Sequence, residues 1–176
     1  MGEAPVASRV PTGPNVQQTD GSKSPLRTYQ DLLNSAHDAD TWEYHATSEL
    51  ALVDLDTSEV TSLGTGVFSS ASLSPDELWL MTARIQRPYS YLMPSYLFPQ
   101  RIEVAPVAAL DSPAVTFDIP VGEGIPIGGV RTGPRSFQWA ASRSATLFWA
   151  EALDGGDPKA EVAHRDRWMA ISAPFA

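Results

Sequence analysis

The chain has 176 residues, which is enough for one ordinary domain with a hydrophobic core. Its formal net charge of -9 at pH 7, with no compensating block of Lys and Arg, argues against nucleic acid as a partner. There is no cysteine, so disulfides and thiolate metal sites are excluded, and no apolar run approaches the roughly 18 residues that span a membrane.

The first segment, residues 1–25, is rich in Pro, Gly, Ser, Thr and Gln and lacks apolar periodicity. We therefore expect a loop or disordered lead-in there. Four apolar residues then recur at helical spacing, namely Leu26, Tyr29, Leu32 and Leu33. This pattern predicts a short connector helix within residues 26–36, centred on 29–34, that packs on the following sheet.

From Ser48 onward the pattern changes to short apolar runs separated by turn residues. Strands are expected at 50–55, 60–63, 68–73, 78–83, 101–105, 115–119, 136–139, 146–151 and 167–171. Turn chemistry separates them, as at Ser74-Pro75-Asp76-Glu77, where Pro presets φ and Asp can bond its own backbone. Past Ser48 the sequence therefore predicts an almost wholly β chain.

Two hairpins, around residues 74–76 and 141–142, repeat one design, and each is expected to be followed by an outer strand pair. A repeated four-stranded unit is typical of propeller blades. The fold class predicted is all-β, a partial β-propeller of about two and a half four-stranded antiparallel blades. Closed propellers have about four to eight blades, and an open arc exposes apolar faces and unpaired strand edges. We therefore expect the chain to be incomplete or covered by a partner.

A series of segments between Leu26 and Phe175 gives a more specific indication through its order. The segments are RTYQDLL (27–33), ELALV (49–53), RPYSY (87–91), FP (98–99) with IEV (102–104), IPIG (125–128), VRTGPRS (130–136) and DGGDP (154–158). Together they resemble the propeller of the glutamyl endopeptidase branch of the prolyl oligopeptidase family of serine peptidases, in its bacterial form. The sequence departs from the family pattern at Ala105-Pro106-Val107 and at Ala140.

The resemblance implies that residues 26–176 are part of an N-terminal propeller that covers a C-terminal α/β-hydrolase domain with a Ser-Asp-His triad. The expected partners are that catalytic domain of the same parent chain and a peptide substrate, with neither nucleic acid nor membrane. No Gly-x-Ser-x-Gly elbow occurs in the chain, so we expect the catalytic domain to be absent from it. The function expected is a non-catalytic segment that gates or recognises peptides. A free-standing propeller-like binding or scaffold protein is the alternative.

Other residues with chemical potential favour plainer interpretations. The three histidines, His37, His45 and His164, lack a motif that would make one a general base, and no metal or cofactor is assigned. The glycine-rich stretch 122–128 contains Pro126, which would interrupt the helix that follows a nucleotide loop, so a plain loop is expected. Residues 154–157 predict a tight turn rather than a calcium loop.

The stretch Arg87-Pro88-Tyr89-Ser90-Tyr91 is the strongest candidate for substrate binding. Pro88 disfavours helix at Arg87, which could place a guanidinium and two phenols, Tyr89 and Tyr91, at the lip of a propeller funnel. A peptidase that prefers acidic P1 residues needs a cation for the substrate carboxylate, and Arg can bind it bidentately. Arg131 and Arg135 could do the same from the next blade. In the alternative interpretation, these arginines pair with local Asp and Glu residues and anchor their loops.

Overall fold

The computed structural model describes residues 3–6 and 28–175. Within these residues, one α-helix, α1 (Ala36–Ala46), precedes nine strands and a short 3-10 helix, η1 (Ser95–Leu97). The strands are β1 (Ser48–Val53), β2 (Val60–Gly66), β3 (Phe68–Leu73), β4 (Trp79–Ile85), β5 (Gln100–Pro106), β6 (Val115–Ile119), β7 (Arg135–Trp139), β8 (Thr146–Ala152) and β9 (Asp166–Ser172). Within the described ranges, no helix is both long enough and apolar enough to cross a bilayer.

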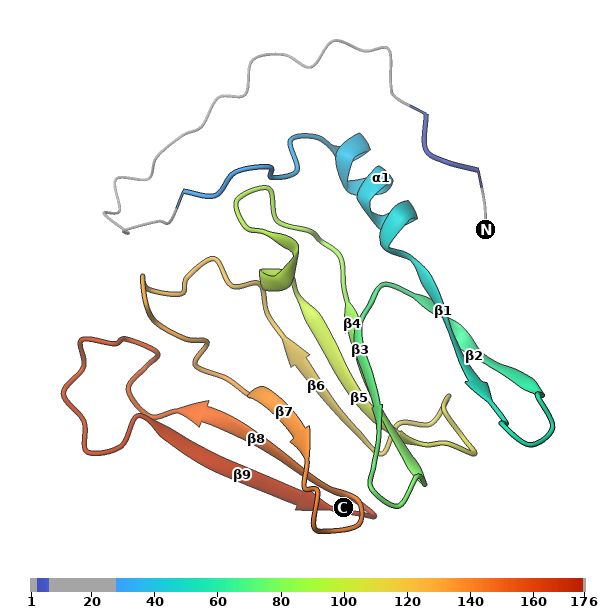
Figure 1. The fold of residues 1–176 in the computed structure, drawn as a ribbon. Coiled ribbons are helices and arrows are strands. Elements are labelled where there is room, and N and C mark those ends of the chain that lie inside the picture. The colour runs from blue at the N-terminus through green and yellow to red at the C-terminus, as the bar shows by residue number, and fades with distance from the viewer. Residues whose placement is uncertain (1–2, 7–27, 176) are drawn as a thin grey trace.

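Three antiparallel sheets contain all nine strands (Figure 1), in the orders β1-β2, β3-β4-β5-β6 and β7-β8-β9. Each strand pairs with its neighbour in the chain, so the connections are simple reversals. The predicted all-β fold is thereby confirmed, with helix limited to α1 and η1 in the part of the chain described. One detail was wrong: the hairpin at 141–142 is followed by the single strand β9, whereas the hairpin at 74–76 is followed by β5 and β6.

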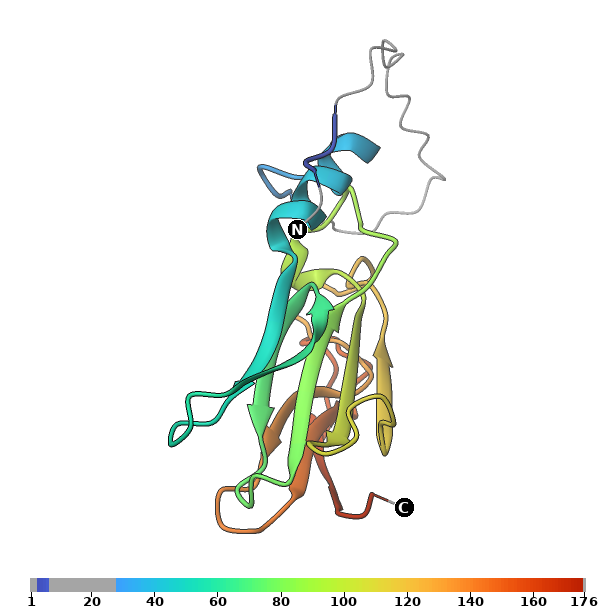
Figure 2. The same cartoon turned by 90° about the vertical axis from the view of Figure 1, so that its right-hand side faces the viewer.

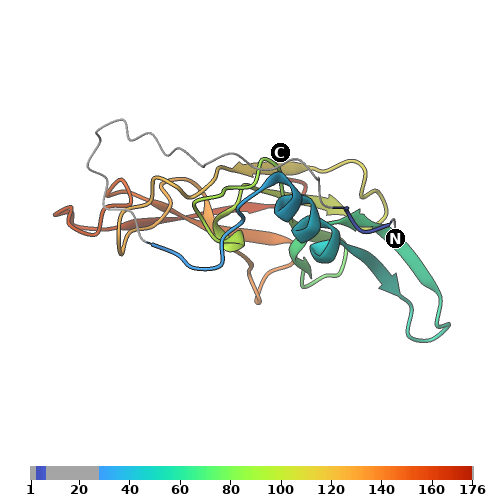
Figure 3. The same ribbon diagram turned by 90° about the horizontal axis from the view of Figure 1, so that it is seen from above.

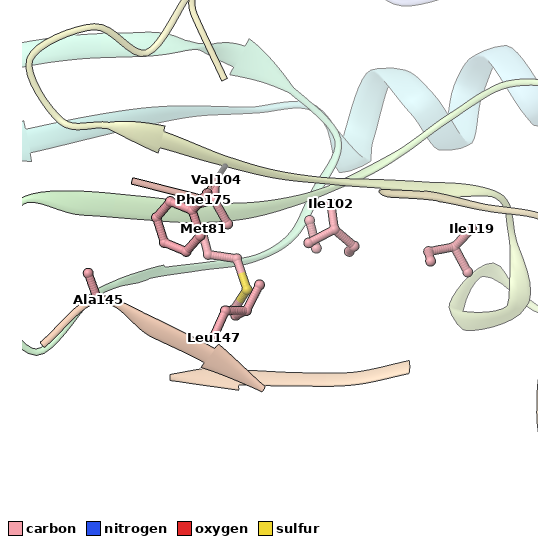
Figure 4. Close-up of a cluster of buried hydrophobic side chains, with 8 residues drawn as sticks. Met81, Ile102, Val104, Ile119, Ala145, Leu147 and Phe175 are labelled. Atoms are coloured by element: carbon pink, nitrogen blue, oxygen red, sulfur yellow. The ribbon is translucent and has the colours of Figure 1, made fainter. Parts of the chain in front are cut away.

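The main core lies between the four-stranded sheet and the three-stranded sheet. Alternate residues of β4 and β5, such as Met81 and Val104, point toward Leu147 of β8 (Figure 4). Leu147 and Val104 are both 0% exposed. Complete burial of such a side chain stabilises the fold by about 1.5–3 kcal/mol, so this interface supplies much of the stability of the fold.

Aromatic residues close the core near the C-terminal end. The ring of Phe175 packs edge-on against Trp79 at 4.8 Å and lies 6.2 Å from Trp139. The indole N–H of Trp139 donates to the carbonyl oxygen of Ser72 at 3.2 Å, which links the two sheets directly. These contacts fix how the three-stranded sheet sits on its neighbour.

The prediction of a helix around residues 29–34 was wrong, because residues 28–35 have no helical structure and α1 begins only after Ser35. The Ser35 hydroxyl accepts from the backbone N–H of Asp38 at 3.1 Å, and the Asp38 carboxylate accepts from the N–H of Asn34 at 2.9 Å. This reciprocal cap sets the start of the helix and outweighs the apolar spacing that precedes it. The expected lead-in, residues 1–25, lies outside the described residues except for residues 3–6, and so does Leu26 at the start of the expected helix.

Candidate functional site

The long connections of the molecule gather at one end of the sheets. The loops 86–99, 120–134 and 153–165 lie there together with α1, and we call this the long-loop end (Figures 1 and 2). The opposite end carries the shorter connections 74–78, 107–114 and 140–145. All four residues proposed from the sequence to bind substrate, Arg87, Tyr89, Arg131 and Arg135, lie in or beside these long loops. Figure 3 shows the molecule from this end, with α1 in front of the sheets.

Arg87 lies just after β4 and contacts the carboxylates of α1. Its Nε donates to Glu43 Oε2 at 2.6 Å and its Nη2 donates to Asp40 Oδ1 at 2.7 Å. The hydrogen bond to Asp40 has the largest effect on the pKa of Arg87, followed by the one to Glu43, and both raise it above its ordinary value. The guanidinium also lies 4.9 Å from the centre of the Tyr89 ring. The arginine therefore links the end of a strand to the helix, and a role in substrate binding stays a prediction.

Tyr89 is buried beneath Arg87, at 7% exposure, whereas Tyr91 is exposed. The Tyr89 ring packs edge-on against Trp42 of α1, with ring centres 4.8 Å apart, and stacks on Phe98 at 5.2 Å. Burial is the main cause that raises the pKa of Tyr89 to about 12, from an ordinary value of 10.0. The two tyrosines therefore do not form a pair of phenols at one lip, and Tyr89 serves the small core that holds α1.

Hydrogen bonds connect the three long loops into one unit. Ser90 Oγ donates to the Glu123 carboxylate at 2.5 Å, and the N–H of Gly122 donates to the carbonyl of Leu97 at 2.8 Å. The N–H of Val130 donates to the carbonyl of Gly156 at 3.1 Å. A side chain at Gly156 would collide with the Val130 carbonyl oxygen, so the last two loops approach as closely as a glycine permits. The long-loop end is therefore a connected surface rather than three independent loops.

Arg131 differs from Arg87 because its named partners are neutral. Its Nη2 donates to the carbonyl of Leu97 at 3.0 Å and its Nη1 donates to the carbonyl of Pro120. The side chain is partly buried, and this burial lowers its pKa from the ordinary value. It lines a pocket of about 200 Å³ formed by the loop 120–134 and its neighbours. Of the three candidate arginines, Arg131 is the one that has no carboxylate partner among the described residues.

Arg135, at the start of β7, pairs with Asp166 at the start of β9 and is mostly buried. Both residues line a second pocket beside the first, together with Asp154 and Arg165. Arg165 donates to Asp154 at 2.9 Å, so both arginines of this pocket have an acidic partner. The structure thus places Arg87 with Tyr89 at α1 and sets Arg131 and Arg135 in adjacent pockets.

The remaining sequence candidates have plain structural settings. Residues 122–128 form an irregular loop without a helix, as expected. The Asp154 carboxylate accepts from the N–H of Gly156 at 2.8 Å, which confirms the tight turn predicted there. In the ranges 3–6 and 28–175, no three His, Cys, Asp or Glu side chains are grouped in a way that could hold a metal ion.

The sequence interpretation missed the acidic face of α1, formed by Asp40 and Glu43, because it placed the helix too early. A signal was available: Ser35 followed by Asp38 is the pattern of a helix N-terminus. With the helix begun at that point, Asp40 and Glu43 lie three residues apart on one helical face, and Trp42 lies between them in the sequence.

Comparison with curated proteins gives two matches over most of the chain. A protein of Oryza sativa subsp. japonica named "Probable glutamyl endopeptidase, chloroplastic" is 41% identical over 169 residues, covering 94% of this chain. A protein of Arabidopsis thaliana with the same name is 39% identical over 182 residues, covering 99% of this chain. The chain spans only 18% of the length of each. No family model and no solved structure matches it. The chain is thus homologous, over most of its length, to proteins named as glutamyl endopeptidases.

Proposed function

We propose that this chain is a non-catalytic part of the β-propeller of a prolyl oligopeptidase-type serine peptidase, where it gates or recognises peptide substrates. The observation that carries the proposal is the 39–41% identity to two proteins named probable glutamyl endopeptidase. The proposal includes a bacterial form of the family, an α/β-hydrolase catalytic domain of the same parent chain as the partner, and a peptide as the substrate.

The arrangement of the sheets supports the propeller part of the proposal. The sheet β3–β6 is a four-stranded antiparallel meander, which is the form of a propeller blade. The sheet β7–β9 starts in the same way, and its middle strand β8, like β4, is largely buried. The two sheets pack face to face around one core, as successive blades do.

The absence of a nucleophile motif from the chain supports the non-catalytic part of the proposal. The chain contains no Gly-x-Ser-x-Gly elbow, whose strained turn presents the serine nucleophile in an α/β-hydrolase. Because the chain spans 18% of the matched proteins, most of such a parent lies outside it. In this proposal, the long-loop end faces the peptide, and Arg87, Tyr89, Arg131 and Arg135 are its candidate contact residues.

The test compares the 176-residue chain with the longer gene product that the proposal requires. Both are incubated with chromogenic peptides that end in Glu and with a fluorophosphonate probe that labels active serines. We expect the longer protein to be labelled and to cleave after Glu, and the chain alone to do neither. Peptide cleavage by the chain alone, or a longer protein without peptidase activity, would contradict the proposal. The second result would favour a binding or scaffold protein.

A further inference from the structure

The described arginines fall into two groups by the partner of their charge. Five form ion pairs with Asp or Glu side chains, namely Arg87, Arg101, Arg135, Arg165 and Arg167. Of those without such a pair among the described residues, Arg84 of β4 lies over the ring of Phe68 in β3. Arg143 is exposed on the turn between β7 and β8. Arg131 alone combines a missing carboxylate partner with a position in a pocket at the long-loop end.

The hydrogen bonds of Arg131 orient its guanidinium without neutralising it. A guanidinium has five N–H donors, and two of them are used by the carbonyl oxygens of Leu97 and Pro120. The other three donors, which include Nε–H, are enough for a bidentate contact with a carboxylate. Because the two carbonyls belong to different loops, the guanidinium is held in place before any ligand arrives.

The pocket that Arg131 lines suits one side chain with an aliphatic stem. Its volume of about 200 Å³ lies below the roughly 300–1,000 Å³ typical of pockets for drug-sized ligands. Its walls include Ile119, Ile125 and Pro126, which offer apolar surface to methylene groups. A ligand with a short aliphatic chain and a terminal anion would satisfy both the walls and the charge.

We propose that the Arg131 pocket binds the side-chain carboxylate of a glutamate residue in a peptide and thereby contributes to the choice of peptide. This inference rests on the proposed function, since that proposal makes a peptide the ligand. Arg87 and Arg135 are weaker candidates, because a substrate carboxylate would have to displace Asp40 and Glu43 from the first, or Asp166 from the second. Arg131 needs no such exchange.

The direct experiment titrates the isotopically labelled chain with two neutral-ended probes, N-acetyl-glutamate amide and N-acetyl-glutamine amide, and follows the amide resonances by NMR. We expect the glutamate probe to shift resonances of Val130, Arg131 and Thr132 and to bind about tenfold more tightly than its glutamine analogue. Arg131→Met should abolish the difference between the probes. Arg143→Met, which removes an exposed arginine from the opposite end, should preserve it.

A structural role of Arg131 is separated by a second variant and a second assay. Arg131→Lys retains the charge and should retain part of the preference for glutamate, whereas a mere loss of folding would remove binding of both probes. The same variants in the longer protein are compared by the ratio of kcat/KM for Glu and Gln peptides, which we expect to fall about tenfold in Arg131→Met. Equal binding of the two probes by the wild-type chain, or an unchanged kcat/KM ratio in Arg131→Met, would overturn the inference. Cleavage after Glu that persists in this variant would leave the proposed function standing while the Arg131 inference fails. Preferential binding of the glutamate probe, without any peptidase activity in the longer protein, would support the Arg131 inference and contradict the proposed function.

Discussion

Removal of the Arg87 guanidinium should loosen α1 without disturbing the sheets. Arg87→Ala deletes the contacts with Asp40 and Glu43 and the position over the Tyr89 ring. The arginine side chain is 47% exposed, so solvent screens both ion pairs and each is worth about 0.2–1 kcal/mol. The contact with the ring adds about 0.5–1 kcal/mol. Together the change should cost about 1–3 kcal/mol of local stability.

Amide hydrogen exchange measures this local cost directly. A loss of about 1–3 kcal/mol corresponds to roughly 5–150-fold faster exchange of the α1 amides, with the amides of β4 and β5 unchanged. Arg101→Ala is the matched control, because it removes an ion pair at a similar exposure of 44% whose acidic partner, Asp118, lies on β6 and not on α1. Unchanged exchange in α1 of Arg87→Ala would refute the anchoring role. If the longer protein also lost its preference for Glu, the guanidinium would act on substrate instead.

Three further changes test other parts of the structure. Phe98→Ala, at a side chain that is 2% exposed, should cost about 3–5 kcal/mol in urea unfolding, while Leu92→Ala, at an exposed position of the same loop, should stay within about 0.5 kcal/mol. Gly156→Ala should destabilise the chain by more than about 1–2 kcal/mol, because it adds a clash with backbone to a positive φ of 74°, whereas Gly133→Ala meets open space and should be nearly neutral in thermal melts. The hydrogen bond that the Asp38 carboxylate accepts from the backbone N–H of Asn34 is the main cause that lowers the pKa of Asp38. The ionised carboxylate therefore stabilises α1 fully above the ordinary pKa of 3.8, and this stabilisation is lost as the pH falls through the lowered pKa. Acid titration should therefore fray the start of α1 in the wild type, and Asp38→Asn should remove that dependence.

The strands were predictable from sequence because their signal is local. Short apolar or alternating runs mark the strands, and turn residues separate strands that pair with their neighbours in the chain. The range expected for β3, residues 68–73, agrees with the strand observed. The helix was misplaced because α1 has a weak apolar stripe with Ala39 as its buried residue, so capping rather than periodicity defines it.

The settings of the candidate site residues could not be predicted, because their partners are distant in the sequence. Arg87 meets Asp40 across 47 positions, and Arg135 meets Asp166 across 31. No local pattern indicates which acidic residue a given arginine will find, so the sequence put Arg87 first and could not single out Arg131. The fold separates them, since it supplies carboxylates to two and only carbonyl oxygens to Arg131.

A structure of the longer peptidase that we propose contains this chain tests the central claim most directly. The account predicts that the sheets β3–β6 and β7–β9 stand as successive blades of a closed propeller, with the long-loop end facing a catalytic domain and the peptide path. A chain that stands apart from any further blades, or a long-loop end turned away from the catalytic domain, would contradict it.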